Sequence, residues 1–275
     1  MKYPIGIQSF DRLREDGFVY VDKTALVYNL VQTGSIYFLS RPRRFGKSLL
    51  VSTLACYFQG RKELFDGLAI ADLEKDWLQY PIFRIDFNGG PYTQPGVLEA
   101  TIEGYLGNWE DIYGKNLNYT TTGDRFKELL RRAYERTGQR AVVLIDEYDV
   151  PLAKAFELGY YNSMTLLIRN LFENALKTND SLEFAVLTGC LRIAKESIFT
   201  GTNNFISDTI TDSRLNEYFG FVQSEVDQIL KDADVLDKAE SIREWYDGYH
   251  FGDFDVYCPW DVMNYLLELQ RNPKA

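Results

Sequence analysis

The stretch Ser35-Ile-Tyr-Phe-Leu-Ser-Arg-Pro-Arg-Arg-Phe-Gly-Lys-Ser-Leu-Leu50 decides the fold of this chain. Its apolar run from Ile36 to Leu39 predicts a short buried strand, and the loop that follows ends in Gly46-Lys47-Ser48 before a helix expected over about 47–59. In a phosphate-binding P-loop of this layout, backbone N–H groups and the positive end of the helix dipole face one anion. The sequence therefore predicts a phosphate site at this turn.

The candidate nucleotide contacts are Arg43, Arg44, Phe45, Gly46, Lys47, Ser48 and Leu49. Lys47 would reach the β- and γ-phosphates as a compact charge, and the Ser48 hydroxyl would ligate Mg²⁺. The usual spacing of such a loop places a glycine at position 41, where this chain has Arg41. Taken alone, the stretch therefore leaves an ordinary basic turn before a helix as the alternative.

A second signal lies further along the chain, at Ala141-Val-Val-Leu-Ile-Asp-Glu-Tyr-Asp149. This apolar run is too short for a helix and is typical of a buried parallel strand. Ligands of open α/β sheets bind beyond the carboxyl ends of the strands, so Asp146 should emerge beside the phosphate loop and hold Mg²⁺. Glu147 would then polarise the water that attacks the γ-phosphate. Acids that merely end an apolar strand are the alternative, but the two signals in this order favour a nucleotide site.

The composition sets the protein class. With 275 residues, 45% of them hydrophobic, the chain can bury the core of one large or two modest domains. It has no apolar run long enough for a membrane span and no apolar signal region, which predicts a soluble, cytoplasmic protein. Its three cysteines and single His250 lack metal-ligand spacing, so we expect no zinc site.

The net charge of −10 disfavours a non-specific nucleic-acid coat, because neutralising phosphates requires a basic face. Arg41, Arg43 and Arg44, beside Lys47, form a local exception. We interpret these three arginines as a small positive patch that could bind an anion.

The rest of the chain alternates strands and helices. We expect strands at Phe18–Val21, Ile82–Phe87, Ser181–Gly189 and Asp208–Asp212, and helices at 23–33, 97–113, 123–137 and 161–177. This alternation predicts an α/β fold with a doubly wound, mainly parallel sheet over residues 1–210. Short helices at 224–231, 235–246 and 259–270 predict a small helical subdomain over 211–275 that would cover the nucleotide.

The aromatic residues of this last part are Trp245, Tyr246, Tyr249, Phe251, Phe254, Tyr257 and Trp260. We expect them to pack in a core rather than to stack with nucleic-acid bases.

Several blocks of the chain resemble the bacterial AAA-ATPase-like domain family, which is related to P-loop ATPases and often fused to a C-terminal nuclease-like domain of the PD-(D/E)XK type. The matching blocks are Pro4–Phe10, Tyr20–Thr24, Phe38–Leu49, Leu144–Asp149, Leu187–Gly189 with Arg192, Lys195–Phe199, Asn203-Asn204 and Trp245–Tyr249. They follow one another in order over nearly the whole chain. The resemblance includes Arg41, which belongs to this family's degenerate phosphate loop.

The resemblance implies an additional-strand ATPase core, in which the Thr188 strand lies between the P-loop strand and the Asp146 strand. Thr188 would then occupy a sensor-like place near the γ-phosphate, with Arg192 just beyond it, so the catalytic candidates are Glu147, Thr188 and Arg192. Implied partners are a nuclease-like effector domain, nucleic acid and a second copy of the chain. No nuclease motif occurs in this sequence.

Two functions stay open at this point. The first is an ATP–Mg²⁺-binding protein, with probable hydrolysis, that drives or gates an effector. The second is a non-hydrolysing module that binds nucleic acid or protein through its arginine-rich loop. The chain lacks a guanine-reading Asn-Lys-x-Asp segment, which favours ATP over GTP.

Overall fold

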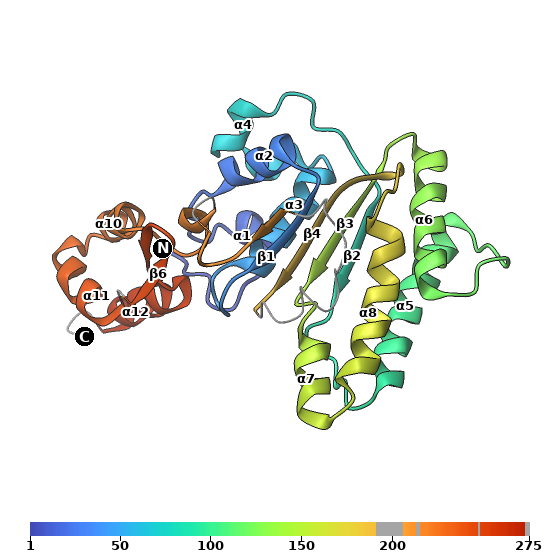
Figure 1. The fold of residues 1–275 in the computed structure, drawn as a ribbon. Coiled ribbons are helices and arrows are strands. Elements are labelled where there is room, and N and C mark those ends of the chain that lie inside the picture. Colours follow the sequence, from blue (N-terminus) through green and yellow to red (C-terminus); the bar gives the residue numbers. More distant parts are fainter. Residues whose placement is uncertain (191–205, 213–214, 247, 273–275) are drawn as a thin grey trace.

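The computed structural model describes residues 1–190, 206–212, 215–246 and 248–272. Its centre is a five-stranded sheet in the order β2-β3-β4-β1-β5, and all four neighbouring pairs run parallel (Figure 1). The strands are β1 (Ile36–Ser40), β2 (Ile82–Asp86), β3 (Ala141–Asp146), β4 (Leu182–Gly189) and β5 (Ile206–Asp208). The predicted α/β class is confirmed, and the Thr188 strand lies between the P-loop strand and the Asp146 strand.

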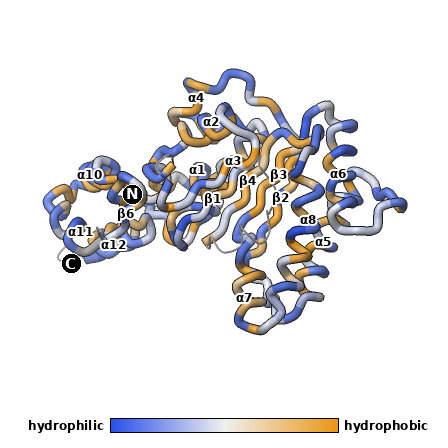
Figure 2. The backbone as a smooth tube through the Cα atoms, viewed as in Figure 1, coloured by the Kyte–Doolittle hydropathy of each residue, from blue (hydrophilic) through white to orange (hydrophobic). Residues whose placement is uncertain are grey.

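The central strands are buried on both faces, which explains why they are continuous apolar runs. Alternate residues of β1 enter different cores: Phe38 joins one hydrophobic cluster and Leu39 the other. In β3, Val143 and Val142 divide in the same way. Figure 2 shows the hydrophobic residues concentrated along these strands.

Helices cover both faces of the sheet, as a doubly wound fold requires (Figure 1). One face carries α1 (Phe10–Glu15), α2 (Thr24–Thr33), α3 (Lys47–Phe58) and α4 (Ala69–Leu73). The other carries α5 (Pro95–Tyr113), α6 (Thr122–Thr137), α7 (Val150–Leu158) and α8 (Tyr161–Leu176). Within the described ranges, no helix combines the length and the apolar character that crossing a membrane would need.

The C-terminal part consists of three helices and a hairpin, gathered at one end of the molecule beside the N-terminus (Figure 1). The elements are α10 (Gln223–Asp232), α11 (Ala239–Tyr246), β6 (Tyr249–Phe251), β7 (Phe254–Val256) and α12 (Pro259–Arg271). The three helices share a third hydrophobic cluster with Tyr3, and Ile5 and Val19 pack against it, whereas Phe251 and Val256 of the hairpin belong to the cluster around α3. The N-terminal segment is therefore a structural part of this region.

Two sequence predictions need correction. Phe18–Val21 forms no strand: Val19 donates its N–H to the Lys2 carbonyl (2.9 Å) and packs against the third cluster instead of joining the sheet. The last strand of the sheet ends at Asp208 instead of starting there. Beyond it the chain turns, since the Asp212 carboxylate accepts the Thr209 N–H at 2.8 Å.

Arg41 is also placed differently from expectation. Its side chain is fully buried rather than part of a surface patch, and its guanidinium pairs with Asp208 at the end of β5. It also donates to the Asn216 side chain (2.9 Å) and lies 4.6 Å above the Phe219 ring. The Arg41 backbone N–H donates to the Gly189 carbonyl (3.1 Å) and so prolongs the sheet ladder. Because Arg41 is not among the residues with positive φ, the position does not demand glycine.

Arg41→Ala should destabilise the protein by about 3–5 kcal/mol, because it removes the cation that pairs with the buried Asp208 carboxylate. Chemical denaturation of the nucleotide-free protein measures this change. Arg12→Ala is the matched control, since its pair with Asp16 is exposed and should contribute about 0–1 kcal/mol. Equal effects of the two substitutions would contradict a structural role for the buried arginine.

Candidate active site

A cavity of about 550 Å³ lies beside the carboxyl edge of the sheet. The loop between β1 and α3 forms its floor, and the N-terminal segment with α2 forms one wall. The C-terminal part supplies the opposite wall through Phe221, Trp260 and Met263. Asn88 and Glu147, which follow β2 and β3, complete the lining. This volume is typical of sites for small molecules.

The loop from 41 to 48 delivers the start of α3 to the cavity. Gly46 precedes the helix with φ of +84°, a left-handed conformation that glycine adopts without strain. Arg44 also has positive φ (+73°), which is uncommon for a residue with a side chain. The first N–H groups of a helix have no intrahelical acceptor, so the backbone at Lys47, Ser48 and Leu49 can receive an anion.

Lys47 is nearly buried, with 3% of its side chain exposed, and its ammonium group has three neighbours. Nζ lies 3.3 Å from Glu147 Oε1, donates to the Pro42 carbonyl at 3.2 Å, and lies 3.3 Å from Cys190 Sγ. The structure thus brings together the lysine of the loop and the acid that directly follows β3. An incoming phosphate would compete with Glu147 for the same cation.

Asp146 and Thr188 meet at the ends of β3 and β4. The Thr188 hydroxyl donates to Asp146 Oδ1 and accepts the Glu147 N–H at 3.4 Å. Both side chains are buried, so the contact fixes the orientation of the carboxylate. The neighbouring Gly189 is required by packing, because a Cβ there would lie 2.4 Å from Tyr148 Cε1. Thr188 therefore contacts the Asp146 carboxylate and the Glu147 backbone with the same hydroxyl group.

Glu147 sits just past β3 in a strained conformation, with φ of +53° and 15% of its side chain exposed. Strain of this kind persists only where the surroundings enforce it, and it clusters at functional sites. Burial raises the pKa of Glu147; Lys47 opposes the shift, while Asp146 and Asp149 add to it. A carboxylate with a raised pKa is better suited to accept a proton near neutral pH.

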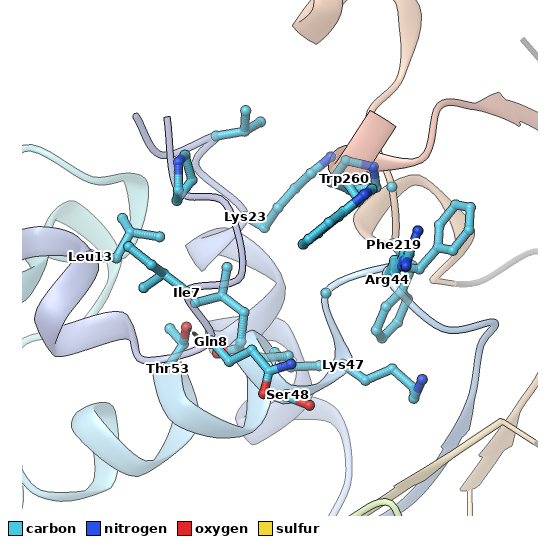
Figure 3. Close-up of a pocket in the computed structure, with 18 of the residues that line it drawn as sticks. Ile7, Gln8, Leu13, Lys23, Arg44, Lys47, Ser48, Thr53, Phe219 and Trp260 are labelled. Atoms are coloured by element: carbon cyan, nitrogen blue, oxygen red, sulfur yellow. Dashed lines mark hydrogen bonds between the residues drawn. The ribbon is translucent and has the colours of Figure 1, made fainter. Parts of the chain in front are cut away.

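The remaining predicted contacts are dispersed. Arg43 is exposed and lines the cavity. Ser48, which is partly buried, also lines it (Figure 3). Arg44 stacks on Trp260, with Cζ 4.6 Å from the ring centre. Phe45 lines the cavity but is buried, and it packs against Tyr249 and Phe251 at centroid distances of 4.8 and 5.0 Å. Arg192 lies outside the described residues.

Sequence reasoning missed several residues of the site. Asp86 ends β2 in register with Asp146, and its pKa is raised by burial and by that neighbouring charge. The sequence could have indicated Asp86, because β2 is another short strand with apolar residues that ends in an acid. Asn88 and Gln8 also line the cavity. Cys190 follows the Thr188 strand directly, and only the fold shows its contact with Lys47.

The donor chemistry near the loop fits Mg²⁺. Ser48 and Asp146 offer a hydroxyl and a carboxylate, the oxygen ligands that this ion prefers. In the part of the chain that the structure describes, no group of three or more His, Cys, Asp or Glu side chains could hold a metal unaided. That agrees with an ion held by one or two protein ligands together with phosphate oxygens.

This chain is similar in sequence to known proteins. Residues 4–199 match the model of the AAA-ATPase-like family, described as predicted AAA-ATPase. A relative from Azotobacter chroococcum mcd 1, described as an uncharacterized protein in the vnfD 5' region, is 39% identical over 276 residues. The match covers 99% of this chain and 53% of the relative, so the chain spans about half of that protein's length.

Among solved structures, the Aeropyrum pernix ORC1 protein in complex with DNA aligns with a TM-score of 0.39 and 11% identity. The alignment covers 92% of this chain and 61% of that one. The family match, in contrast, extends over most of the chain and includes the P-loop, Asp146, Glu147 and Thr188. The chain belongs to the AAA-ATPase-like family of predicted AAA-ATPases.

Proposed function

We propose that this chain binds ATP with Mg²⁺ and hydrolyses it, and that turnover drives or gates an effector. The observation that carries the proposal is the convergence of Lys47, Glu147, Asp146 and Thr188 at adjoining strand ends beside the cavity. Each supplies one requirement of phosphoryl transfer: a charge for the phosphates, a base, a metal ligand and a fixed geometry.

Phosphate binding would begin with an exchange of partners. The terminal phosphate would take the Lys47 ammonium that now faces Glu147, 3.3 Å away. Ser48 and Asp146 would hold Mg²⁺, which neutralises phosphate charge when it is bound. Thr188 would keep Asp146 in its orientation through the hydrogen bond already present.

Glu147, released from Lys47, would act as the general base. Its carboxylate would take a proton from water as the water oxygen forms a bond to the γ-phosphorus and the bridging oxygen leaves with ADP. The raised pKa of Glu147 favours this transfer. Arg192, beside the Thr188 strand in sequence, stays a proposed partner for the developing charge.

The arginine-rich loop supports the alternative of a non-hydrolysing module less well. Arg41 is buried against Asp208 and Arg44 stacks on Trp260, so two of the three arginines are engaged within the protein. A partner reached through ATP turnover fits better. In longer proteins such as the Azotobacter relative, we propose that this partner is the part of the protein outside the matched half. The candidates for the partner are a nuclease-like domain, nucleic acid and a second copy of the chain.

Lys47→Ala should lower the affinity for ATP–Mg²⁺ by roughly 10- to 150-fold, because hydrogen bonds to charged groups contribute about 1.5–3 kcal/mol. Isothermal titration calorimetry measures the change. Lys62→Ala removes an exposed lysine outside the cavity and should leave affinity unchanged. Equal affinities for the Lys47→Ala protein and the wild type would sink the phosphate-loop assignment.

Glu147→Gln should keep ATP affinity, or raise it by releasing Lys47, while turnover falls by about 10²- to 10⁴-fold. Phosphate release at saturating ATP gives the turnover. In the wild type, acidification should abolish turnover as pH falls through the Glu147 pKa, which lies above its ordinary value. The residual turnover of the Glu147→Gln protein should not show this loss at acidic pH.

Asp146→Asn should behave differently, because it removes charge that holds the metal, and should weaken Mg²⁺-dependent binding as well. Glu157→Gln, at an exposed position of α7, is the matched control for loss of a carboxylate. If wild-type protein binds ATP without turnover, and Glu147→Gln protein is indistinguishable from it, the chain is a nucleotide sensor and not an enzyme.

Cys190 offers an independent chemical readout. Cys56 and Cys258 are buried and burial raises the pKa of each to about 11, whereas Cys190 is partly exposed and Lys47 partly offsets the rise in its pKa caused by burial. Iodoacetamide should therefore label Cys190 first, as read by peptide mass spectrometry, and ATP–Mg²⁺ should slow that labelling. The protection should vanish in Lys47→Ala. Labelling that ignores ATP would argue against phosphates beside Lys47.

A further inference from the structure

The cavity has two chemically different ends. At the phosphate loop it is lined by Arg43, Lys47 and Ser48, which suit a charged group. Away from the loop its lining is mainly apolar and comes from three parts of the chain; examples are Ile5, Ile7, Leu26, Val27, Phe221 and Met263. A ligand that matches both ends carries an anionic group and a flat, apolar group.

Trp260, the second residue of α12, stands in the wall of this cavity (Figure 3). The start of α12 is held in place by a two-way backbone pairing between Phe221 and Tyr257, with N···O distances of 3.0 and 2.8 Å. The Arg44 guanidinium lies over the Trp260 ring, 4.6 Å from its centre. A Cβ added at Gly6 would lie 4.0 Å from the ring edge, so the N-terminal segment passes close by.

Among the aromatic rings of the cavity lining, Tyr20, Tyr218 and Trp260 are partly buried, whereas Phe45 and Phe219 are almost fully buried. Phe45 is buried against the β6–β7 hairpin, and Phe219 is buried beneath the Arg41 guanidinium. Trp260 is only partly buried, and Arg44 lies over its ring. A cation over an indole ring restrains its rotation, so the ring is pre-organised to receive a flat ligand.

We propose that Trp260 stacks on the base of the bound nucleotide, with Arg44 bracing the ring, and that this contact selects purine over pyrimidine nucleotides. The inference rests on the proposed nucleotide-binding function and deepens it. Trp260 lies outside residues 4–199, the part of the chain that the family model matches. Stacking on an aromatic side chain tolerates different bases, but a two-ring purine covers more of an indole than a one-ring pyrimidine.

The proposal also links the two halves of the site. The phosphate loop contributes Arg44, and the C-terminal part contributes the ring that Arg44 contacts. A nucleotide held at both ends would therefore bind the loop and α12 together, whereas a bare polyphosphate would bind the loop alone.

Calorimetry with the Mg²⁺ complexes of ATP, CTP and inorganic tripolyphosphate tests this. In Trp260→Ala, ATP affinity should fall by roughly 5- to 150-fold, the loss expected for one stacked base. Tripolyphosphate affinity should not change, and the preference for ATP over CTP should shrink. Trp260→Phe should retain an intermediate preference. Phe156→Ala is the matched control, because it removes a 76% exposed aromatic ring outside the cavity.

Each other outcome is decisive. Equal losses of ATP and tripolyphosphate affinity in Trp260→Ala would show that the ring supports the loop and not the base, and unchanged ATP affinity would also overturn the proposal. If the wild type binds tripolyphosphate as tightly as ATP and CTP, the phosphate loop stands and base stacking fails. If the wild type binds none of the three, the proposed function itself fails. Thermal melting of each variant shows whether it is folded, and should Trp260→Ala not fold, the ATP-to-CTP ratio of Trp260→Phe decides alone.

Discussion

The insertion of β4 between β1 and β3 is the constraint on which the site depends. Parallel pairing on both sides of β4 brings Leu39 level with Thr188 and Ile145 level with Leu187. The loop of Lys47 and the acids of β3 therefore emerge on either side of one threonine. Without this strand order, the Lys47–Glu147 contact and the Thr188–Asp146 hydrogen bond would have no geometric basis.

The same edge of the sheet holds several unfavourable arrangements. A lysine and a glutamate face each other with little access to water, and Glu147 and Arg44 both have positive φ. Positive φ at a residue that carries a side chain costs of order 1–3 kcal/mol and persists only where surrounding structure enforces it. The two hydrophobic clusters on either face of the sheet provide that structure. Stability built in the core thus maintains the strained backbone at this edge of the sheet.

Sequence reasoning succeeded where the signal was local. The apolar runs of β1, β3 and β4 identified the sheet, and the acids after the β3 run identified the edge at which Lys47, Asp146 and Glu147 lie. It failed where a residue's partner is distant in the chain. The charge of Arg41 suggested a surface position, whereas Asp208 and Asn216, 167 and 175 residues away, make burial tolerable. Short elements such as α1, α4 and the β6–β7 hairpin span too few residues to show a clear hydrophobic periodicity. Packing against the rest of the protein determines their secondary structure.

The sharing of one hydrophobic cluster by Tyr3 and Met263 has a consequence for synthesis on the ribosome. The two residues are 263 − 3 = 260 positions apart, and at about 5–20 residues per second that interval takes roughly 13–52 s. The sheet can assemble earlier, but the N-terminal segment must wait for its partners. The cavity wall formed by Trp260 and Met263 is thus among the last parts to be completed. A nascent chain would be unable to enclose a ligand until almost all of this sequence has left the exit tunnel.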